Sequence, residues 1–233
     1  MKVSIIVPAY NEEKNIQECL EALIDQDYPE KDYEIIIVDD CSTDKTPEII
    51  KNISENAKET NLVIKYIRND KNEGNAQTRI NGAKKATNSL LLFIDSKIIV
   101  DRKTLKNINI INYMPIVGNP IIIYENSTSR FSYLVRKKVY YPYFGEEFEP
   151  VYFSKHNFDK ISKGTGIFFC SKELFISSQP KDLSKTASYD IKLLWNIVQK
   201  KKILKHPDIK GKYLTRKSLK EEIKHTFHRG PKF

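Results

Sequence analysis

The sequence predicts an α/β fold with a mostly parallel central sheet and helices on both of its faces. In the first hundred residues, short apolar runs alternate with stretches whose apolar residues recur at helical spacing. The apolar runs are nearly continuous, which is typical of strands buried on both faces. Four such strands separated by three helices imply crossover connections, and crossovers place neighbouring strands parallel.

The composition limits the class of protein. The chain has 233 residues, 40% of them hydrophobic, which suits one large globular domain or two small ones. No apolar run approaches the ~18 residues of a membrane-spanning helix, and the N-terminus lacks the layout of a secretory signal, so we expect a cytoplasmic protein. The three cysteines are too few and too far apart for a disulfide framework or a zinc site, and we expect reduced thiols.

The positive charge lies at the C-terminal end. From Lys200 onward there are ten lysines, two arginines and three acidic residues, which accounts for the whole net charge of +9. Residues 216–233 are predicted to form a basic amphipathic C-terminal helix and tail, because a capping box at Ser218 precedes an apolar stripe. Two explanations stay open for the charge: a solvated basic face, or attraction to phosphate or to an anionic membrane surface.

The first half of the chain is regular. Residues 3–7 predict a strand that Pro8 should stop, because proline has no N–H for a ladder. Asn11 is predicted to cap the next helix, with two glutamates in its first turn. Further strands are predicted at 34–38, 62–67 and 90–94, with helices from Thr46 and over 75–86.

The second half has a weaker pattern. A helix through Leu105 and Ile108, strands at 121–124 and 167–170, a short element at 172–177 and a helix opened by Ser188 or Asp190 are predicted. The aromatic and basic segment 131–153 has poor periodicity. It suits either a loop packed on the sheet, which we favour, or an interfacial surface that touches a lipid-linked acceptor.

Three segments at predicted strand ends form a recognisable set. They are residues 7–12 (VPAYNE), residues 38–44 (VDDCSTD) and Asn72-Glu73-Gly74 with Arg79 and Gly82, followed by Asp95. Together they resemble the inverting family-two glycosyltransferases of the GT-A fold. The resemblance implies one GT-A domain over residues 1–215, with a nucleotide-binding half at 1–100 and an acceptor half at 101–215.

The resemblance also implies a donor site for a nucleotide sugar, with a UDP-sugar favoured. A wall around the base and acceptors for base or ribose hydrogens are expected, and the planar cation of an arginine matches phosphate oxygens. For the two aspartates, capping of their own turn is the alternative. The residues expected to bind the donor are Pro8, Ala9, Tyr10, Glu12, Asp39, Asp40, Arg79, Asp95 and Lys97.

Members of the family usually carry Asp-x-Asp after the fourth strand, where it holds Mg²⁺ or Mn²⁺ against the diphosphate. This chain has Asp95-Ser96-Lys97, which replaces a hard oxygen ligand with an ammonium. Three alternatives stay open: Lys97 neutralises the leaving diphosphate without a metal, a divalent metal binds Asp95 and donor oxygens, or Lys97 only faces solvent.

Inversion requires a base opposite the leaving group. The resemblance implies that Asp190, which follows Tyr189 at the start of a predicted helix, is this base; an N-cap without catalytic duty is the alternative. The Gln-x-x-Arg-Trp motif of some relatives is not reproduced near His225 and His228, which favours transfer of a single sugar. The expected acceptor is a glycan or a lipid-linked hydroxyl, reached with peripheral membrane contact through the basic tail.

Other functions explain the sequence less well. A catalytically degenerate protein that binds a nucleotide sugar is the main alternative, because Lys97 replaces the second carboxylate. A nucleic-acid binder is disfavoured, since no recognition module or stacking motif occurs. A dehydrogenase is disfavoured because no Gly-x-Gly-x-x-Gly follows the first strand.

Overall fold

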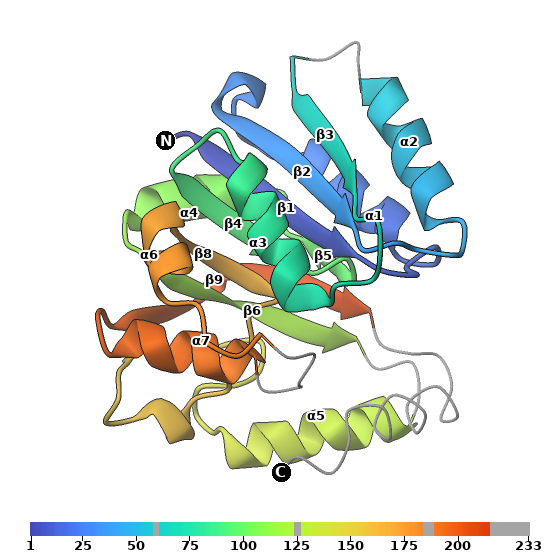
Figure 1. Ribbon diagram of the computed structural model, residues 1–233. Coiled ribbons are helices and arrows are strands. Elements are labelled where there is room, and N and C mark those ends of the chain that lie inside the picture. The colour runs from blue at the N-terminus through green and yellow to red at the C-terminus, as the bar shows by residue number, and fades with distance from the viewer. Residues whose placement is uncertain (58–60, 124–126, 184–188, 215–233) are drawn as a thin grey trace.

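A computed structural model describes residues 1–57, 61–123, 127–183 and 189–214. It contains nine strands and seven α-helices within these ranges (Figure 1). In chain order they are β1 (Val3–Ala9), α1 (Ile16–Ile24), β2 (Tyr33–Asp39), α2 (Thr46–Asn56), β3 (Val63–Arg68), α3 (Asn75–Lys85), β4 (Leu90–Ile94), β5 (Ile98–Val100), α4 (Thr104–Ile111), β6 (Ile116–Ile123), α5 (Ser127–Val139), β7 (Val151–Phe153), β8 (Ile167–Ser171), α6 (Lys172–Ser177), α7 (Tyr189–Val198) and β9 (Ile203–Leu214).

One continuous sheet joins the two halves of the chain. Its order is β3-β2-β1-β4-β8-β6-β9-β5, and β7 pairs with β9. The strands β3, β2, β1 and β4 are parallel, whereas β8 runs antiparallel to both β4 and β6. The chain leaves β1 toward β2 and β3 and then returns through α3 to β4 on the other side of β1. The carboxyl ends of β1 and β4 therefore form a topological switch point, where ligands of open α/β sheets bind.

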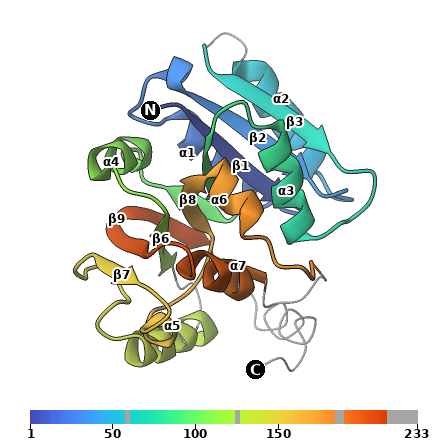
Figure 2. The same ribbon diagram turned by 60° about the vertical axis from the view of Figure 1, so that its left-hand side comes forward.

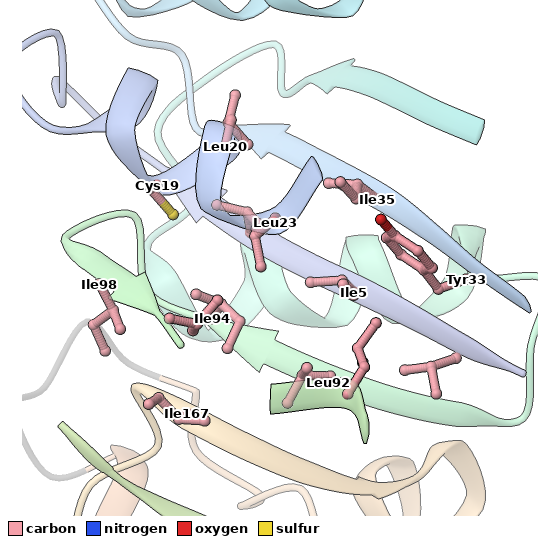
Figure 3. Close-up of a cluster of buried hydrophobic side chains, with 14 of the residues drawn as sticks. Ile5, Cys19, Leu20, Leu23, Tyr33, Ile35, Leu92, Ile94, Ile98 and Ile167 are labelled. Atoms are coloured by element: carbon pink, nitrogen blue, oxygen red, sulfur yellow. The ribbon is translucent and has the colours of Figure 1, made fainter. Parts of the chain in front are cut away.

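The central strands are buried on both faces, which explains their continuous apolar runs. Successive side chains of β1 point to opposite faces of the sheet, so Ile5 contacts one core and Ile6 the other. The first core lies under α1, α2 and α4, and α1 covers it with Cys19, Leu20 and Leu23 (Figure 3). The second core lies under α3, α6 and α7, which cross the other face of the sheet (Figures 1 and 2). The predicted α/β fold, with helices on both faces, is confirmed.

Two predictions around the first strand are wrong. Pro8 does not stop β1, which continues to Ala9. Pairing with β4 ends at Ile6, so at Pro8 only β2 remains as a neighbour. Asn11 does not cap α1, which begins at Ile16. Asn11 adopts a positive φ of 53°, and its side chain accepts a hydrogen bond from the backbone N–H of Thr43, so it joins the loops after β1 and β2.

The second half departs further from its pattern. Residues 127–139 form the helix α5 rather than a loop packed on the sheet. The strands β5 and β9 were not predicted, because β5 is short and β9 is interrupted by polar residues and a proline. In the part of the chain that the structure covers, no helix combines the length and the apolar character needed to span a bilayer. The predicted helix and tail at 216–233 lie outside the described residues.

Candidate functional site

The predicted site residues gather at one edge of the sheet. Tyr10 and Asp95 directly follow β1 and β4, and Asp40 follows β2, so all three lie at carboxyl ends of parallel strands (Figure 1). Gly166 lies beside Asp95, because the backbone N–H of Asp95 donates to the Gly166 carbonyl at 2.9 Å. The antiparallel direction of β8 thus brings the segment before it to the same edge.

Arg79 lies at the centre of this edge. The residue belongs to α3, its side chain is fully buried, and its Nη2 donates to Oδ1 of Asp95 at 2.6 Å and to the Thr165 carbonyl at 3.1 Å. Its Nη1 donates to the Thr165 hydroxyl and, at 3.4 Å, to Oδ1 of Asp190. Burial lowers the pKa of an arginine, but the two carboxylates outweigh it, so the pKa of Arg79 lies above its usual value.

This geometry shows Arg79 engaged with protein groups, and its contact with donor phosphates stays a prediction. The guanidinium has no exposed surface, and its Nη1 and Nη2 groups donate to protein oxygens, whereas Nε is buried without a hydrogen-bond partner among the described residues. A planar fork with several donors can hold two carboxylates at a fixed separation, which an ammonium cannot do as well. Arg79 therefore connects the carboxylate of Asp95, after β4, with the carboxylate of Asp190, in α7.

Thr165 is a site residue that sequence reasoning missed. Its side chain is fully buried, and its hydroxyl accepts from Arg79 and donates to Oδ1 of Asp190 at 2.5 Å. The only signal was its position in the Gly164-Thr165-Gly166 segment. A Cβ on Gly166 would lie 3.1 Å from Oδ2 of Asp95 and 2.8 Å from Ile98, so glycine permits the close approach of this segment.

Asp190 lies in the first turn of α7, where it is the second residue. The side chain is 40% exposed, and Oδ1 is held by Thr165 and Arg79. These contacts go to side chains from the loop before β8 and from α3, so they differ from those of an N-cap, which accepts from the backbone of its own helix. The carboxylate is therefore oriented from one side and accessible to solvent.

Glu12 and Lys97 form an ion pair between the loops after β1 and β4. Lys97 Nζ lies 3.0 Å from Oε1 of Glu12, and Oε2 of Glu12 accepts from Asn15 at 2.7 Å. Both side chains are partly buried, and Lys97 lies two residues after Asp95. Lys97 is therefore a paired and partly buried side chain, and its role toward a diphosphate stays a prediction.

Hydrogen bonds of Asp40 connect the end of β2 with the start of α3. Its Oδ1 accepts from Asn69 Nδ2 at 2.9 Å and from the backbone N–H of Glu73 at 2.8 Å, and its Oδ2 accepts from the N–H of Gly74 at 2.8 Å. Gly74 has a positive φ of 85°, which glycine adopts without strain. The segment Asn72-Glu73-Gly74 therefore has a structural role, because its backbone N–H groups bind the carboxylate of Asp40.

Asp39 is fully buried at the end of β2. Its Oδ1 accepts from the backbone N–H of Ser42 at 2.9 Å, and its Oδ2 accepts from Tyr66 at 3.0 Å and Arg68 at 2.7 Å. The bond to Ser42 is the turn-capping bond that the alternative for this pair predicts. Contact of either aspartate with a base or ribose stays a prediction.

Tyr10 is the exposed member of the predicted wall around the base. Pro8 and Ala9 are buried within β1, whereas the side chain of Tyr10 is 46% exposed at the end of the strand. An exposed aromatic ring offers a flat apolar surface for stacking on a planar base. Of the three residues predicted to surround the base, Tyr10 is therefore the one with accessible surface.

The residues around Asp95 do not fit a metal held by the protein alone. Oδ1 of Asp95 already pairs with Arg79, and the ammonium of Lys97 occupies the place of the second carboxylate in the motif. Among the residues whose placement is described, no group of three or more histidine, cysteine or acidic side chains could hold an ion. Divalent cations prefer several hard oxygen ligands, so a metal here would depend on donor oxygens.

Comparisons with known proteins show the family of the chain. The model of the family described as Glycosyl transferase family 2 matches residues 4–168. A glycosyltransferase from Methanococcus voltae, named dolichyl N-acetyl-alpha-D-glucosaminyl phosphate 3-beta-D-2,3-diacetamido-2,3-dideoxy-beta-D-glucuronosyltransferase, is 30% identical over 98% of this chain and 71% of its own length. The poly(ribitol-phosphate) beta-N-acetylglucosaminyltransferase TarS of Staphylococcus aureus is 37% identical over 46% of this chain. The chain spans only 18% of the length of TarS in that match.

Solved structures show the same fold. Residues 1–349 of S. aureus TarS, in complex with UDP-GlcNAc, superpose with a TM-score of 0.70 and 23% identity over 94% of this chain and 59% of that chain. The mannosyltransferase PcManGT from Pyrobaculum calidifontis, in complex with GDP-Man and Mn2+, gives a TM-score of 0.67 and 21% identity over 94% and 58%. The expected GT-A fold is confirmed. Because the family model matches residues 4–168, which are more than half of the chain, the chain belongs to glycosyl transferase family 2.

Proposed function

We propose that this protein transfers one sugar from a nucleotide-sugar donor to an acceptor hydroxyl with inversion at the anomeric carbon. The observation that carries the proposal is the direct connection, through Arg79, of Asp95 at the end of β4 and Asp190 in α7. One carboxylate lies where the donor diphosphate is expected and the other where the acceptor is expected. A fixed distance between the two carboxylates suits a displacement in which the acceptor hydroxyl attacks the anomeric carbon on the side opposite to the leaving nucleoside diphosphate.

The proposed reaction follows from general acid–base chemistry. The acceptor hydroxyl oxygen forms a bond to the anomeric carbon while the bond from that carbon to the diphosphate oxygen breaks. Asp190 takes the hydroxyl proton, and the nucleoside diphosphate leaves with the electron pair. The ammonium of Lys97, held near Asp95 by Glu12, neutralises charge that develops on the leaving group.

The donor is proposed to be a UDP-sugar. The structure of TarS with UDP-GlcNAc supports this choice, whereas the GDP-Man complex of PcManGT shows that another base is used within the same fold. Stacking of the base on Tyr10 does not distinguish the two. A thermal-shift comparison of UDP-GlcNAc with GDP-mannose tests the choice, and stabilisation by GDP-mannose alone would contradict it.

The test of the base is Asp190→Asn. This change keeps the shape of the side chain but removes the proton acceptor, so transfer should fall by ~10³-fold or more while donor affinity stays within about twofold. Asp159→Asn is the matched control, because the side chain of Asp159 is fully exposed and pairs with Lys163 rather than with Arg79 or Thr165. An Asp190→Asn protein that still transfers sugar at the wild-type rate would refute the assignment.

Metal dependence has its own test. If Lys97 serves the leaving group, calorimetric donor affinity with and without EDTA should agree within about twofold, and Lys97→Met should weaken it by ~10-fold in both conditions. Strict dependence on Mg²⁺ or Mn²⁺ would instead support the alternative in which a metal binds Asp95 and donor oxygens.

A degenerate protein that binds the donor without transfer is the second candidate. It is favoured by the single carboxylate in the strand-four motif. Release of the nucleotide from a nucleotide sugar, measured without acceptor, separates the two candidates, since hydrolysis that Asp190→Asn abolishes requires a working site.

The acceptor is proposed to be a glycan or a lipid-linked hydroxyl. The name of the Methanococcus voltae relative, which contains a dolichyl phosphate, supports the lipid-linked form. Peripheral contact of residues 216–233 with an anionic membrane on the cytoplasmic side would bring the site to such an acceptor. Cosedimentation with anionic liposomes, with and without residues 216–233, tests the contribution of the tail.

A further inference from the structure

The helix α5 has an unusual outer surface. Phe131 is 68% exposed, and further large apolar side chains on and next to the helix are also exposed: Leu134, Val135, Val139 and Tyr141. At about 100° per residue, the apolar positions 131, 134, 135 and 139 of α5 fall within an arc of roughly 140°. Single exposed apolar residues are common, but a contiguous apolar face marks an interaction surface.

The same helix carries only positive charge. Arg130, Arg136, Lys137 and Lys138 are exposed, and α5 contains no acidic residue. Within the described ranges, none of these four cations forms an ion pair. Lys138 lies in the middle of the apolar arc, and Arg130 and Lys137 lie along its border. The surface therefore combines exposed hydrocarbon with uncompensated positive charge.

The opposite side of α5 packs on the protein. Tyr133 contacts the ring of the buried Phe144, with ring centroids 5.8 Å apart, and Tyr140 contacts the same ring at 6.4 Å. Because Phe131 and Tyr133 are two positions apart, their side chains leave the helix on opposite sides. The exposed residues Glu146, Glu147 and Glu149 follow Phe144 in the loop after α5.

We infer that the outer face of α5, with Phe131, Leu134, Val135 and Val139 among basic side chains, docks on an anionic lipid surface. Acyl chains accept the apolar side chains, and anionic headgroups neutralise the cations in any arrangement. A protein partner would need carboxylates at matching positions within an apolar patch. Figures 1 and 2 show α5 at the margin of the molecule, where a flat surface can approach it.

This inference is independent of the tail and of the identity of the catalytic base. It names a second segment, well separated in sequence from residues 216–233, and it concerns binding to a surface rather than transfer. It therefore makes a different prediction from the tail hypothesis: changes in α5 alone, with the tail intact, should weaken vesicle binding.

The experiment is cosedimentation of the full chain with vesicles of phosphatidylcholine alone and with added phosphatidylglycerol. We expect binding to require phosphatidylglycerol and to fall with salt. Lys137→Gln/Lys138→Gln should reduce the partition coefficient ~25-fold, at about fivefold per charge. Phe131→Ser should reduce it about tenfold.

Matched controls separate a local effect from general charge or hydrophobicity. Lys84→Gln/Lys85→Gln removes two exposed lysines at the end of α3, and Ile110→Ser removes a side chain of α4 that is 69% exposed. Both controls should bind vesicles like the wild type. Equal binding by the α5 variants and the wild type would overturn the proposal, and so would a dimer in light scattering that Phe131→Ser dissociates.

A separate readout keeps this proposal apart from the proposed function. The thermal shift produced by UDP-GlcNAc should be unchanged by the α5 substitutions, because α5 contributes no residue to the site at the ends of β1 and β4. Loss of vesicle binding with unchanged donor binding supports the docking surface. Loss of both would indicate that α5 is needed for folding, and would overturn its assignment as a surface that acts only in docking.

Discussion

Arg79 and Asp190 lie 111 positions apart in the chain, yet Nη1 of the arginine is 3.4 Å from Oδ1 of the aspartate. The same buried guanidinium pairs with Asp95 at 2.6 Å. The three residues belong to α3, to the loop after β4 and to α7. This relationship joins the two halves of the chain at the candidate site, and it leads to the first prediction.

Replacement of Arg79 should affect stability and activity together. Arg79→Met leaves two carboxylates facing each other without their cation, so the free energy of unfolding should fall by about 2–4 kcal/mol in urea titrations. Arg79→Lys restores the charge but not the fork, so it should recover stability in part and transfer hardly at all. Arg102→Met is the control, since its exposed pair with Asp25 should contribute under about 1 kcal/mol. A stable and fully active Arg79→Met protein would show that the pairing has no role.

Thr165 should orient the proposed base without contacting substrate. Thr165→Val removes the hydroxyl that donates to Asp190 while conserving volume, so kcat should fall ~10-fold to 100-fold with KM for the donor unchanged. Thr165→Ser should rescue kcat. Thr104→Val is a useful control, because the Thr104 hydroxyl is buried without a hydrogen-bond partner among the described residues, so its removal should be neutral or stabilising. A purely structural role of Thr165 would lower the stability of Thr165→Val and leave kcat intact.

Gly82 should tolerate no side chain. A Cβ at this position would lie 2.5 Å from Cγ2 of Ile6 and 3.2 Å from Cγ2 of Val38, because α3 packs directly on the sheet. Gly82→Ala should therefore lower the free energy of unfolding by about 1–3 kcal/mol through overpacking, in spite of the better helix propensity of alanine. At Gly164 a Cβ would meet no atom within 4 Å, so Gly164→Ala should leave thermal stability within about 0.5 kcal/mol. Equal effects of the two changes would contradict the close contact of α3.

Glu34 should contribute a pH-dependent part of the stability. Burial raises the pKa of a carboxyl group, but hydrogen bonds from Lys65, Ser4 and Thr87 outweigh it and hold the pKa of Glu34 at about 2, below its usual value of 4.5. The unfolded chain binds the proton more readily, so the contribution is complete above about pH 4.5 and is lost as the pH falls toward 2. Glu34→Gln should thus cost about 2–3 kcal/mol at pH 7 and much less at pH 3. Urea titrations at both values, with the exposed Glu18→Gln as control, measure this difference, and a gap that is constant with pH would exclude the mechanism.

Much of the fold could be predicted because its central strands are buried on both sides. The run at Leu90 to Ile94 forms β4 with the predicted bounds, and its side chains alternate between the two cores. Burial on two faces demands apolar residues at every position, which is a strong signal in a single sequence. By contrast, several positions of β9 are exposed or half-buried, and its sequence contains charged residues and Pro207, so its pairing with β6 carries no clear local signal.

The candidate site divides in the same way. The sequence by itself determined which carboxylates follow the strands, because Asp95 and Asp40 are encoded next to apolar runs that emerge at one edge of a parallel sheet. Only the tertiary structure decided that Arg79 points at Asp95 and Asp190 rather than at solvent, and that Thr165 joins them. The physical reason is that hydrogen bonds between residues 16 to 111 positions apart depend on how helices pack on the sheet, which local patterns of hydrophobicity do not encode.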